Sequence, residues 1–156
     1  MIVVADSSPL IALSRIGRLE LLRDLFGRLV IPEAVWREVV DSVPGKVGVS
    51  EIEGADWIER QTVKDLALVN LLRRDLGAGE SEAIVLAREI SADVLLMDER
   101  RGRDAAKRLG VSCTGMIGLL LEARRLGIVH DPAGIGQDLR DTAGFWISDE
   151  LMDMLR

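Results

Sequence analysis

Hydrophobic residues form short continuous runs along the chain. Between these runs lie stretches in which the hydrophobic residues recur every three or four positions, as in a helix. The first run, 2–5, has no polar interruption, which is typical of a strand buried on both faces of a parallel sheet. A later run, 57–63, alternates between apolar and polar residues, which favours a strand at the edge of the sheet. The predicted strands are 2–5, 29–31, 57–63, 94–97 and 111–114.

Between these runs the apolar residues recur at the spacing of amphipathic helices. Gly17 separates two short helices, and Gly27 ends the second. Pro32 suits the first turn of the next helix, because the N–H that proline lacks has no partner at that position. The predicted helices are 10–16, 19–26, 32–41, 66–76, 80–90, 99–109, 116–126, 131–141 and 148–156, and 43–56 is predicted to be irregular.

Strands that alternate with helices in this way indicate an α/β protein. We expect a three-layer sandwich in which helices flank a mainly parallel central sheet, followed by a C-terminal helical extension over 130–156. The 156 residues are enough to enclose one hydrophobic core, so we expect a single domain over 1–156.

Composition narrows the classes of function. The only cysteine is Cys113, which excludes a disulfide framework and a thiolate metal site. The longest apolar segment, 116–121, is too short to span a bilayer, and the start of the chain does not look like a signal peptide, so we expect a cytoplasmic protein. The net charge of −6 argues against binding of nucleic acid through an overall positive potential, but it is compatible with a local basic rim.

Two aspartates, Asp6 and Asp98, each follow the end of a predicted strand. Taken alone, Asp6 could equally cap the following helix. Because open α/β sheets bind ligands at the carboxyl ends of their strands, however, the two carboxylates can face one another across one crevice. Such a pair repels unless a proton or a cation lies between them. A site with oxygen donors only favours Mg²⁺ or Mn²⁺ over zinc.

Two helix starts offer further acids. Glu38 shares a helix face with apolar residues and therefore points toward the core, where an acid needs a partner or a metal. Glu80 lies in line with the small residues of the helix 80–90, whereas Glu82 points elsewhere and fits the glutamate of a capping box. We therefore prefer Glu80 as the third acid and keep Glu82 as the alternative.

The ordered set of these motifs resembles the PIN-domain superfamily of metal-dependent nucleases, and within it a prokaryotic PIN-like branch related to VapC-type toxins. The resemblance covers almost the whole chain. It is carried by 3–11, 31–35 with Glu38, 79–84, 96–100 with Arg103 and Ala106, Gly115 before the helix that contains Leu119, and 143–148.

The resemblance implies a role for each of these acids. Asp6, Glu38, Glu80 and Asp98 would hold one or two divalent cations that activate water against a phosphodiester, with Glu82 as the alternative to Glu80. Ser7, Arg100 and Arg103 would position the substrate, although Ser7 could equally cap a helix and the arginines could belong to a solvated helix face. The sequence departs from the toxins in two places. Their third acid is commonly aspartate, and Leu96 stands where they often have Thr or Ser.

We therefore expect a Mg²⁺- or Mn²⁺-dependent endoribonuclease, a hydrolase that acts on RNA as the toxin of a toxin–antitoxin pair. A small antitoxin protein would be its partner. The alternative is a non-catalytic PIN-like protein that binds a metal or a partner. We also expect a homodimer, because the C-terminal helix is predicted to expose apolar side chains. These side chains are Leu151, Met152, Met154 and Leu155.

Overall fold

The apolar runs pair into one parallel sheet in the computed structural model, which describes residues 1–41 and 48–156. The strand order is β3-β2-β1-β4-β5, and each neighbouring pair is parallel. Val4 is in register with Val30 on one side, and Ala5 is in register with Leu96 on the other. The bounds are β1 Val3–Ala5, β2 Leu29–Pro32, β3 Ile58–Gln61, β4 Val94–Leu96 and β5 Cys113–Thr114.

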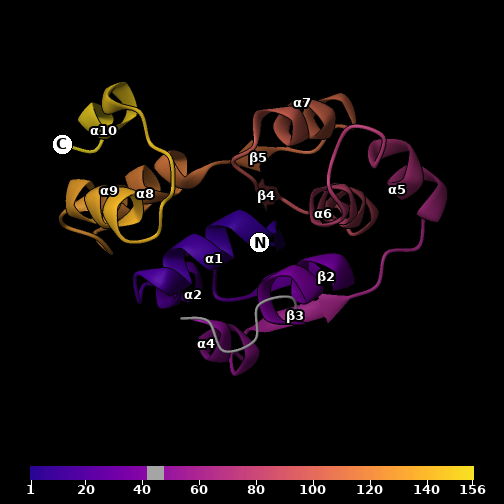
Figure 1. Cartoon of the computed structure of the whole chain (residues 1–156), viewed down its shortest axis with the longest axis horizontal. Helices are drawn as coiled ribbons and strands as arrows, with labels where there is room; N and C mark the ends of the chain where they lie inside the picture. Colours follow the sequence, from indigo (N-terminus) through magenta and orange to yellow (C-terminus); the bar gives the residue numbers. More distant parts are fainter. Residues whose placement is uncertain (42–47) are drawn as a thin grey trace.

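Helices cover both faces of this sheet (Figure 1). On one side lie α5 (Leu66–Leu72), α6 (Ala78–Glu89) and α7 (Arg100–Arg108). On the other side lie α1 (Ser7–Arg15), α2 (Glu20–Phe26), α8 (Met116–Arg125), α9 (Pro132–Asp141) and α10 (Asp149–Met154). The expected three-layer α/β sandwich is confirmed, and every strand pair in the described part of the chain is parallel.

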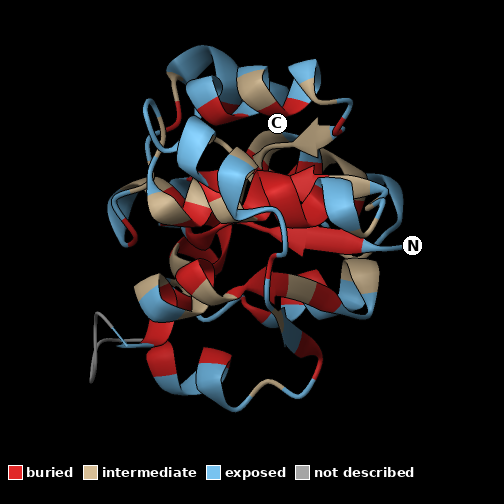
Figure 2. Cartoon of the chain, turned by 90° about the vertical axis from the view of Figure 1, so that its right-hand side faces the viewer, coloured by how far each residue is buried: buried red, intermediate tan, exposed pale blue. Residues whose placement is uncertain are grey.

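The core is formed by the strands and by the inner faces of the helices, which make a band of buried residues through the molecule (Figure 2). Helix α6 contacts β1, β2 and β4, and its residues 83–87 are buried. Because both faces of the central strands are covered, polar residues are excluded from both faces, which explains the continuous apolar runs in the sequence.

Two segments differ from the predictions. The helix expected over 32–41 is divided into α3 (Glu33–Trp36) and a π-helical turn, η1 (Arg37–Asp41). The segment expected to be irregular contains a short helix, α4 (Val49–Glu53), while residues 42–47 lie outside the described part.

The C-terminal helix is only half as exposed as expected. Leu151 and Met154 are exposed, but Met152 and Leu155 are buried, so the prediction is wrong for these two residues. They pack on α9 at Gly136, where an added Cβ would lie 2.7 Å from Leu155 Cδ1 and 3.0 Å from Met152 Sδ. The missing side chain at Gly136 gives α10 the space to bury its apolar face.

The strand order reverses between β1 and β4, because β2 and β3 extend to one side of β1 and β5 extends to the other. Such a reversal leaves a crevice at the carboxyl ends of the two strands, where open α/β sheets bind their ligands. None of the helices in the described ranges is long and apolar enough to cross a membrane.

Candidate functional site

Asp6 lies at this reversal, directly after β1. Its backbone N–H donates to the Leu96 carbonyl at 3.0 Å and so ties β1 to β4. The residue is 3% exposed, and its Oδ1 atom has no hydrogen-bond partner. The pKa of Asp6 is raised to about 6, mainly by burial and also by three neighbouring carboxylates, while the Ser7 amide lowers it. These carboxylates belong to Glu38, Asp98 and Glu99.

Asp98 follows β4 and faces the same crevice. Its Oδ1 accepts a hydrogen bond of 2.8 Å from the Met116 amide at the start of α8, while its buried Oδ2 has no partner. Burial raises the pKa of Asp98, whereas the Met116 amide and the Arg103 guanidinium lower it. Gly115 permits this contact, since a Cβ there would lie 2.9 Å from Asp98 Oδ1.

Glu38 projects from the π-helical turn η1 and joins two other helix starts. Its Oε1 accepts from the Gly79 amide at 2.8 Å, and its Oε2 accepts from Ser7 Oγ at 2.5 Å. A Cβ on Gly79 would lie 2.6 Å from Glu38 Oε1, so glycine is required for this approach. Turns of π-helix occur frequently at functional sites. Here the turn carries the acid that links α1 and α6.

Glu80 and Glu82 have different surroundings. Glu80 Oε1 accepts from the Gly77 amide at 3.4 Å, and its buried Oε2 has no partner. Burial raises the pKa of Glu80 to about 7, with contributions from Glu99 and Asp6. Glu82 Oε1 instead accepts from the Ala34 amide, in the first turn of α3, at 3.1 Å. The structure therefore brings Glu80 to Asp6 and leaves Glu82 as a cap on α3.

Glu80 is the glutamate at the third helical position of α6, and it accepts a hydrogen bond from the amide of the N-cap residue, Gly77. The prediction that Glu82 is the capping-box glutamate is therefore wrong. The reason is that α6 begins at Ala78, earlier than expected, which places Glu80 rather than Glu82 at the third helical position.

Glu99 is a member of the cluster that the sequence did not predict. It precedes the first residue of α7, and its carboxyl group lies beside that of Glu80. The interaction between the two groups raises the pKa of Glu80 and lowers that of Glu99, and the Arg101 and Gly102 amides lower the pKa of Glu99 further. Its position next to Asp98 was the only signal, and that signal does not fix the direction of a side chain.

The residues expected to position a substrate take different places. Ser7 donates to Glu38 and therefore orients an acid of the cluster. Arg103 reaches the crevice, because its NH1 lies 3.1 Å from the position of a Cβ on Gly115. Arg100 is exposed at the first position of α7. Of the two arginines, Arg103 is the one that lies beside the carboxylates.

The cluster has the donor chemistry of a site for a hard cation. Four buried side-chain polar atoms in the described residues lack a partner, and three of them are carboxylate oxygens, of Asp6, Glu80 and Asp98. A buried carboxylate oxygen without a partner costs free energy, and a cation removes this cost. As they stand, no three or more acid, histidine or cysteine side chains in residues 1–41 and 48–156 are arranged as a complete metal site. The residue types therefore fit a hard cation, but their arrangement does not form a closed cage.

The fold and the cluster define an α/β protein with an acidic, all-oxygen site at the reversal point of a parallel sheet. A family model described as PIN domain matches residues 2–156, so the chain belongs to the PIN domain family. PIN domains are generally nucleases and usually use divalent metals, and the chain thus has a nuclease-type fold. No curated protein matches the sequence.

Proposed function

We propose that this protein is a Mg²⁺- or Mn²⁺-dependent endoribonuclease that hydrolyses RNA phosphodiesters. The observation that carries the proposal is the set of three buried carboxylate oxygens without partners, on Asp6, Glu80 and Asp98, around one crevice. Together with Glu38, these residues would hold the cation. The pKa values of all three acids are raised, as expected of buried carboxyl groups with no positive charge in the described residues close enough to neutralise them.

When bound, a divalent cation lowers the pKa of water and neutralises charge on phosphoryl oxygens. The chain's own residues prepare this chemistry. Ser7 Oγ and the Gly79 amide hold Glu38 in one orientation, and the Met116 amide does the same for Asp98. In the pair formed by Glu80 and Glu99, Glu80 takes up a proton first as pH falls, because its pKa is raised and that of Glu99 is lowered.

The proposal includes a biological setting, in which the nuclease is the toxin of a toxin–antitoxin pair and forms a homodimer. Membership of the PIN family supports an antitoxin partner, since PIN domains often act with antitoxins. The exposed apolar side chains of Trp146, Leu151 and Met154 support a contact with another chain. A monomeric mass in light scattering would contradict the homodimer.

A second candidate is a PIN-like protein that binds a metal or a partner but does not cleave RNA. One observation favours it, namely that the carboxylates in the described ranges do not form a ready-made group of three ligands. The two candidates differ in whether bound metal is accompanied by cleavage.

The test is calorimetric titration of the metal-free protein with Mn²⁺, beside an RNA cleavage assay with and without a chelator. We compare the wild type with Asp98→Asn and with Asp24→Asn, which removes the same charge from an exposed position on α2. The nuclease proposal expects binding and metal-dependent cleavage in the wild type and in Asp24→Asn, and neither in Asp98→Asn. Binding without cleavage would favour the second candidate. Absence of binding in the wild type would refute both metal-dependent readings.

A further inference from the structure

A groove runs between α7 and the edge strand β5, next to the carboxylate cluster. It encloses about 590 Å³. Its walls contain two cations, Arg103 and Lys107, and one acid, Asp104, while its floor is formed by residues 110–113. A cavity of this size is within the usual range for a bound small group or a segment of a polymer.

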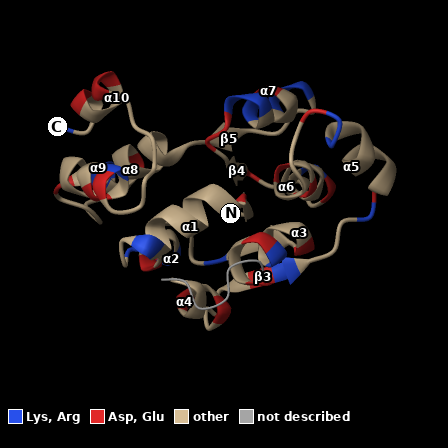
Figure 3. Ribbon diagram, in the orientation of Figure 1, with Lys and Arg blue, Asp and Glu red and all other residues tan. Residues whose placement is uncertain are grey.

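The cations of α7 are divided between two sides of the helix, which is the most basic helix in Figure 3. Arg103 and Lys107 line the groove on the β5 side. Arg101 and Arg108 line a separate cavity of about 500 Å³ on the side of α5. Among the described residues, neither Arg103 nor Lys107 lies within salt-bridge distance of a carboxylate, so both remain available for an anion.

Arg103 connects the groove to the carboxylates. Its NH1 lies over Gly115, 3.1 Å from the position of a Cβ there, and Asp98 Oδ1 lies 2.9 Å from the same point. Burial raises the pKa of Asp98 on one side and of Cys113, in the groove, on the other, and the Arg103 guanidinium between them opposes both shifts. An anionic chain that leaves the crevice past Arg103 therefore enters the groove directly.

The floor of the groove suits a polar ligand as well. β5 is the last strand of the sheet and pairs only with β4. An edge strand presents backbone N–H and C=O groups that have no strand partner. Backbone N–H groups beside Arg and Lys side chains are frequent contacts of nucleic-acid phosphates.

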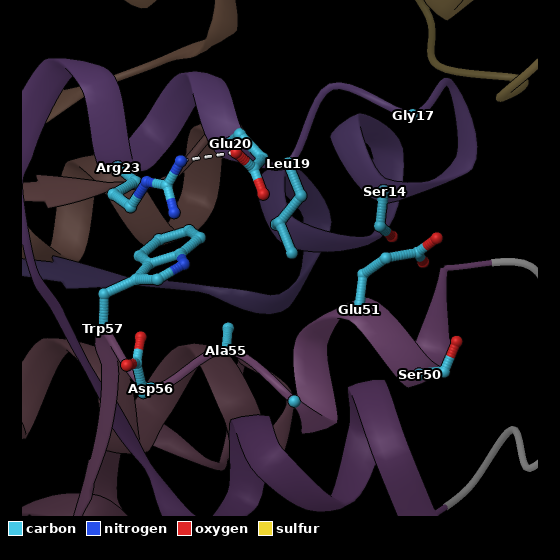
Figure 4. A pocket seen from close by; sticks show the side chains of 11 residues that line it. Ser14, Gly17, Leu19, Glu20, Arg23, Ser50, Glu51, Ala55, Asp56 and Trp57 are labelled. Carbon is cyan, nitrogen blue, oxygen red and sulfur yellow. Dashed lines mark hydrogen bonds and ion pairs between the residues drawn. The ribbon is translucent and has the colours of Figure 1, made fainter.

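Another cavity of the protein lacks these properties. A cavity of about 590 Å³ lies between α2, the end of α1 and α4. Figure 4 shows the side chains that line it. Its walls carry three acids, Glu20, Glu51 and Asp56, and one cation, Arg23, which already pairs with Glu20 at 2.5 Å. This acidic cavity repels a phosphate.

We propose that the groove between α7 and β5 binds a backbone phosphate of the RNA substrate, one held between Arg103 and Lys107 as the strand leaves the carboxylates. The inference rests on the proposed nuclease function and adds the path of the RNA strand, from the carboxylate cluster into the groove between α7 and β5. Lys107 is a substrate-binding residue in this proposal and makes no contact with the reacting phosphate.

The experiment measures fluorescence anisotropy of a labelled single-stranded RNA of mixed sequence, in the presence of a chelator so that no cleavage occurs. Lys107→Ala is compared with Arg108→Ala, because both remove one exposed cation from the same helix, but Lys107 lines the groove and Arg108 lines the other cavity. We expect Lys107→Ala to weaken RNA binding about fivefold. We also expect the slope of the logarithm of the binding constant against the logarithm of the salt concentration to become shallower by about 0.7, the value for one phosphate contact on a single strand. We expect Arg108→Ala to change the affinity less than about twofold, as for a solvent-screened charge that does not contact the strand.

The proposal is overturned if both variants lose affinity equally, if Arg108→Ala alone loses it, or if the wild type binds no RNA. Two further measurements separate this failure from failure of the nuclease function. Lys107→Ala should bind Mn²⁺ as the wild type does, and its kcat/KM should fall by the same factor as its RNA affinity, through KM. If the wild type cleaves RNA and Lys107→Ala equals it in affinity and KM, the groove is wrong and the nuclease stands. If the wild type neither binds Mn²⁺ nor cleaves RNA, the nuclease function itself fails.

Discussion

Replacing Asp6 by asparagine should stabilise the metal-free protein while removing its ability to bind metal. Asp6 is 3% exposed, and its Oδ1 has no partner. Asparagine keeps the shape of the side chain and an oxygen that can accept from the Ser7 amide, but it carries no charge. The substitution therefore removes the burial cost of the charge and its repulsion by neighbouring acids.

The magnitude follows from the ionisation of Asp6. Its pKa rises from 3.8 to about 6 on folding. A tenfold change in an ionisation constant corresponds to about 1.4 kcal/mol, so the ionised carboxylate costs the folded state about 3 kcal/mol well above pH 6. The asparagine NH₂ group loses about 1–2 kcal/mol of this gain if it stays without an acceptor. We expect a net increase of about 1–2 kcal/mol in the free energy of unfolding at about pH 8.

The effect should depend on pH in a defined direction. Because the pKa of Asp6 is higher in the folded chain than in the unfolded chain, its contribution to stability is fully present below 3.8 and is lost as pH rises through about 6. The asparagine variant has no such titration. The advantage of the variant should therefore grow by about 1.4 kcal/mol between about pH 5 and about pH 8.

The assay is urea unfolding in the presence of a chelator at these two pH values. Asp24→Asn is the control, since it removes an aspartate from an exposed position on α2. The reasoning is refuted if Asp6→Asn is less stable than the wild type at the higher pH, or if its advantage is equal at both pH values. If Asp6→Asn is more stable and no longer binds Mn²⁺, the wild type keeps Asp6 for metal binding at a cost in stability.

Three further predictions concern the same cluster. Gly79→Ala should lower the free energy of unfolding by about 1–3 kcal/mol in urea unfolding, because its Cβ collides with the Glu38 carboxylate; an unchanged midpoint would contradict the close approach. Glu80→Gln should weaken Mn²⁺ binding in calorimetry, whereas Glu82→Gln should leave it unchanged and cost about 1 kcal/mol of stability through a weaker cap; the reverse pattern would exchange the two roles. Because the pKa of Asp6 is about 6 and that of Glu80 is about 7, Mn²⁺ affinity should fall as pH drops below 7, and Mn²⁺ binding should release protons. Calorimetry in buffers of different ionisation enthalpy detects this proton release. An affinity that does not depend on pH would exclude these acids as ligands.

The sequence determined the strands and the two aspartates that follow them. A strand buried on both faces requires a continuous apolar run, and this is a local property of the sequence. Asp6 and Asp98 each follow such a run, and the carboxyl ends of parallel strands lie at one edge of a sheet. Their meeting was therefore predictable once the sheet was taken to be parallel.

The tertiary structure decided which other side chains reach them. The predicted start of α6 lies two residues too late, and this error assigns the capping-box position to Glu82 instead of Glu80, although the choice of Glu80 as the acid near Asp6 stands. The π-helical turn that carries Glu38 and the direction of Glu99 depend on contacts between elements far apart in the chain. The division of the α7 cations has the same origin, because the packing of α7 between β5 and α5 decides which cations line the groove and which line the other cavity. Apolar continuity is written into neighbouring residues, whereas the direction of a polar side chain is fixed only when distant segments pack around it.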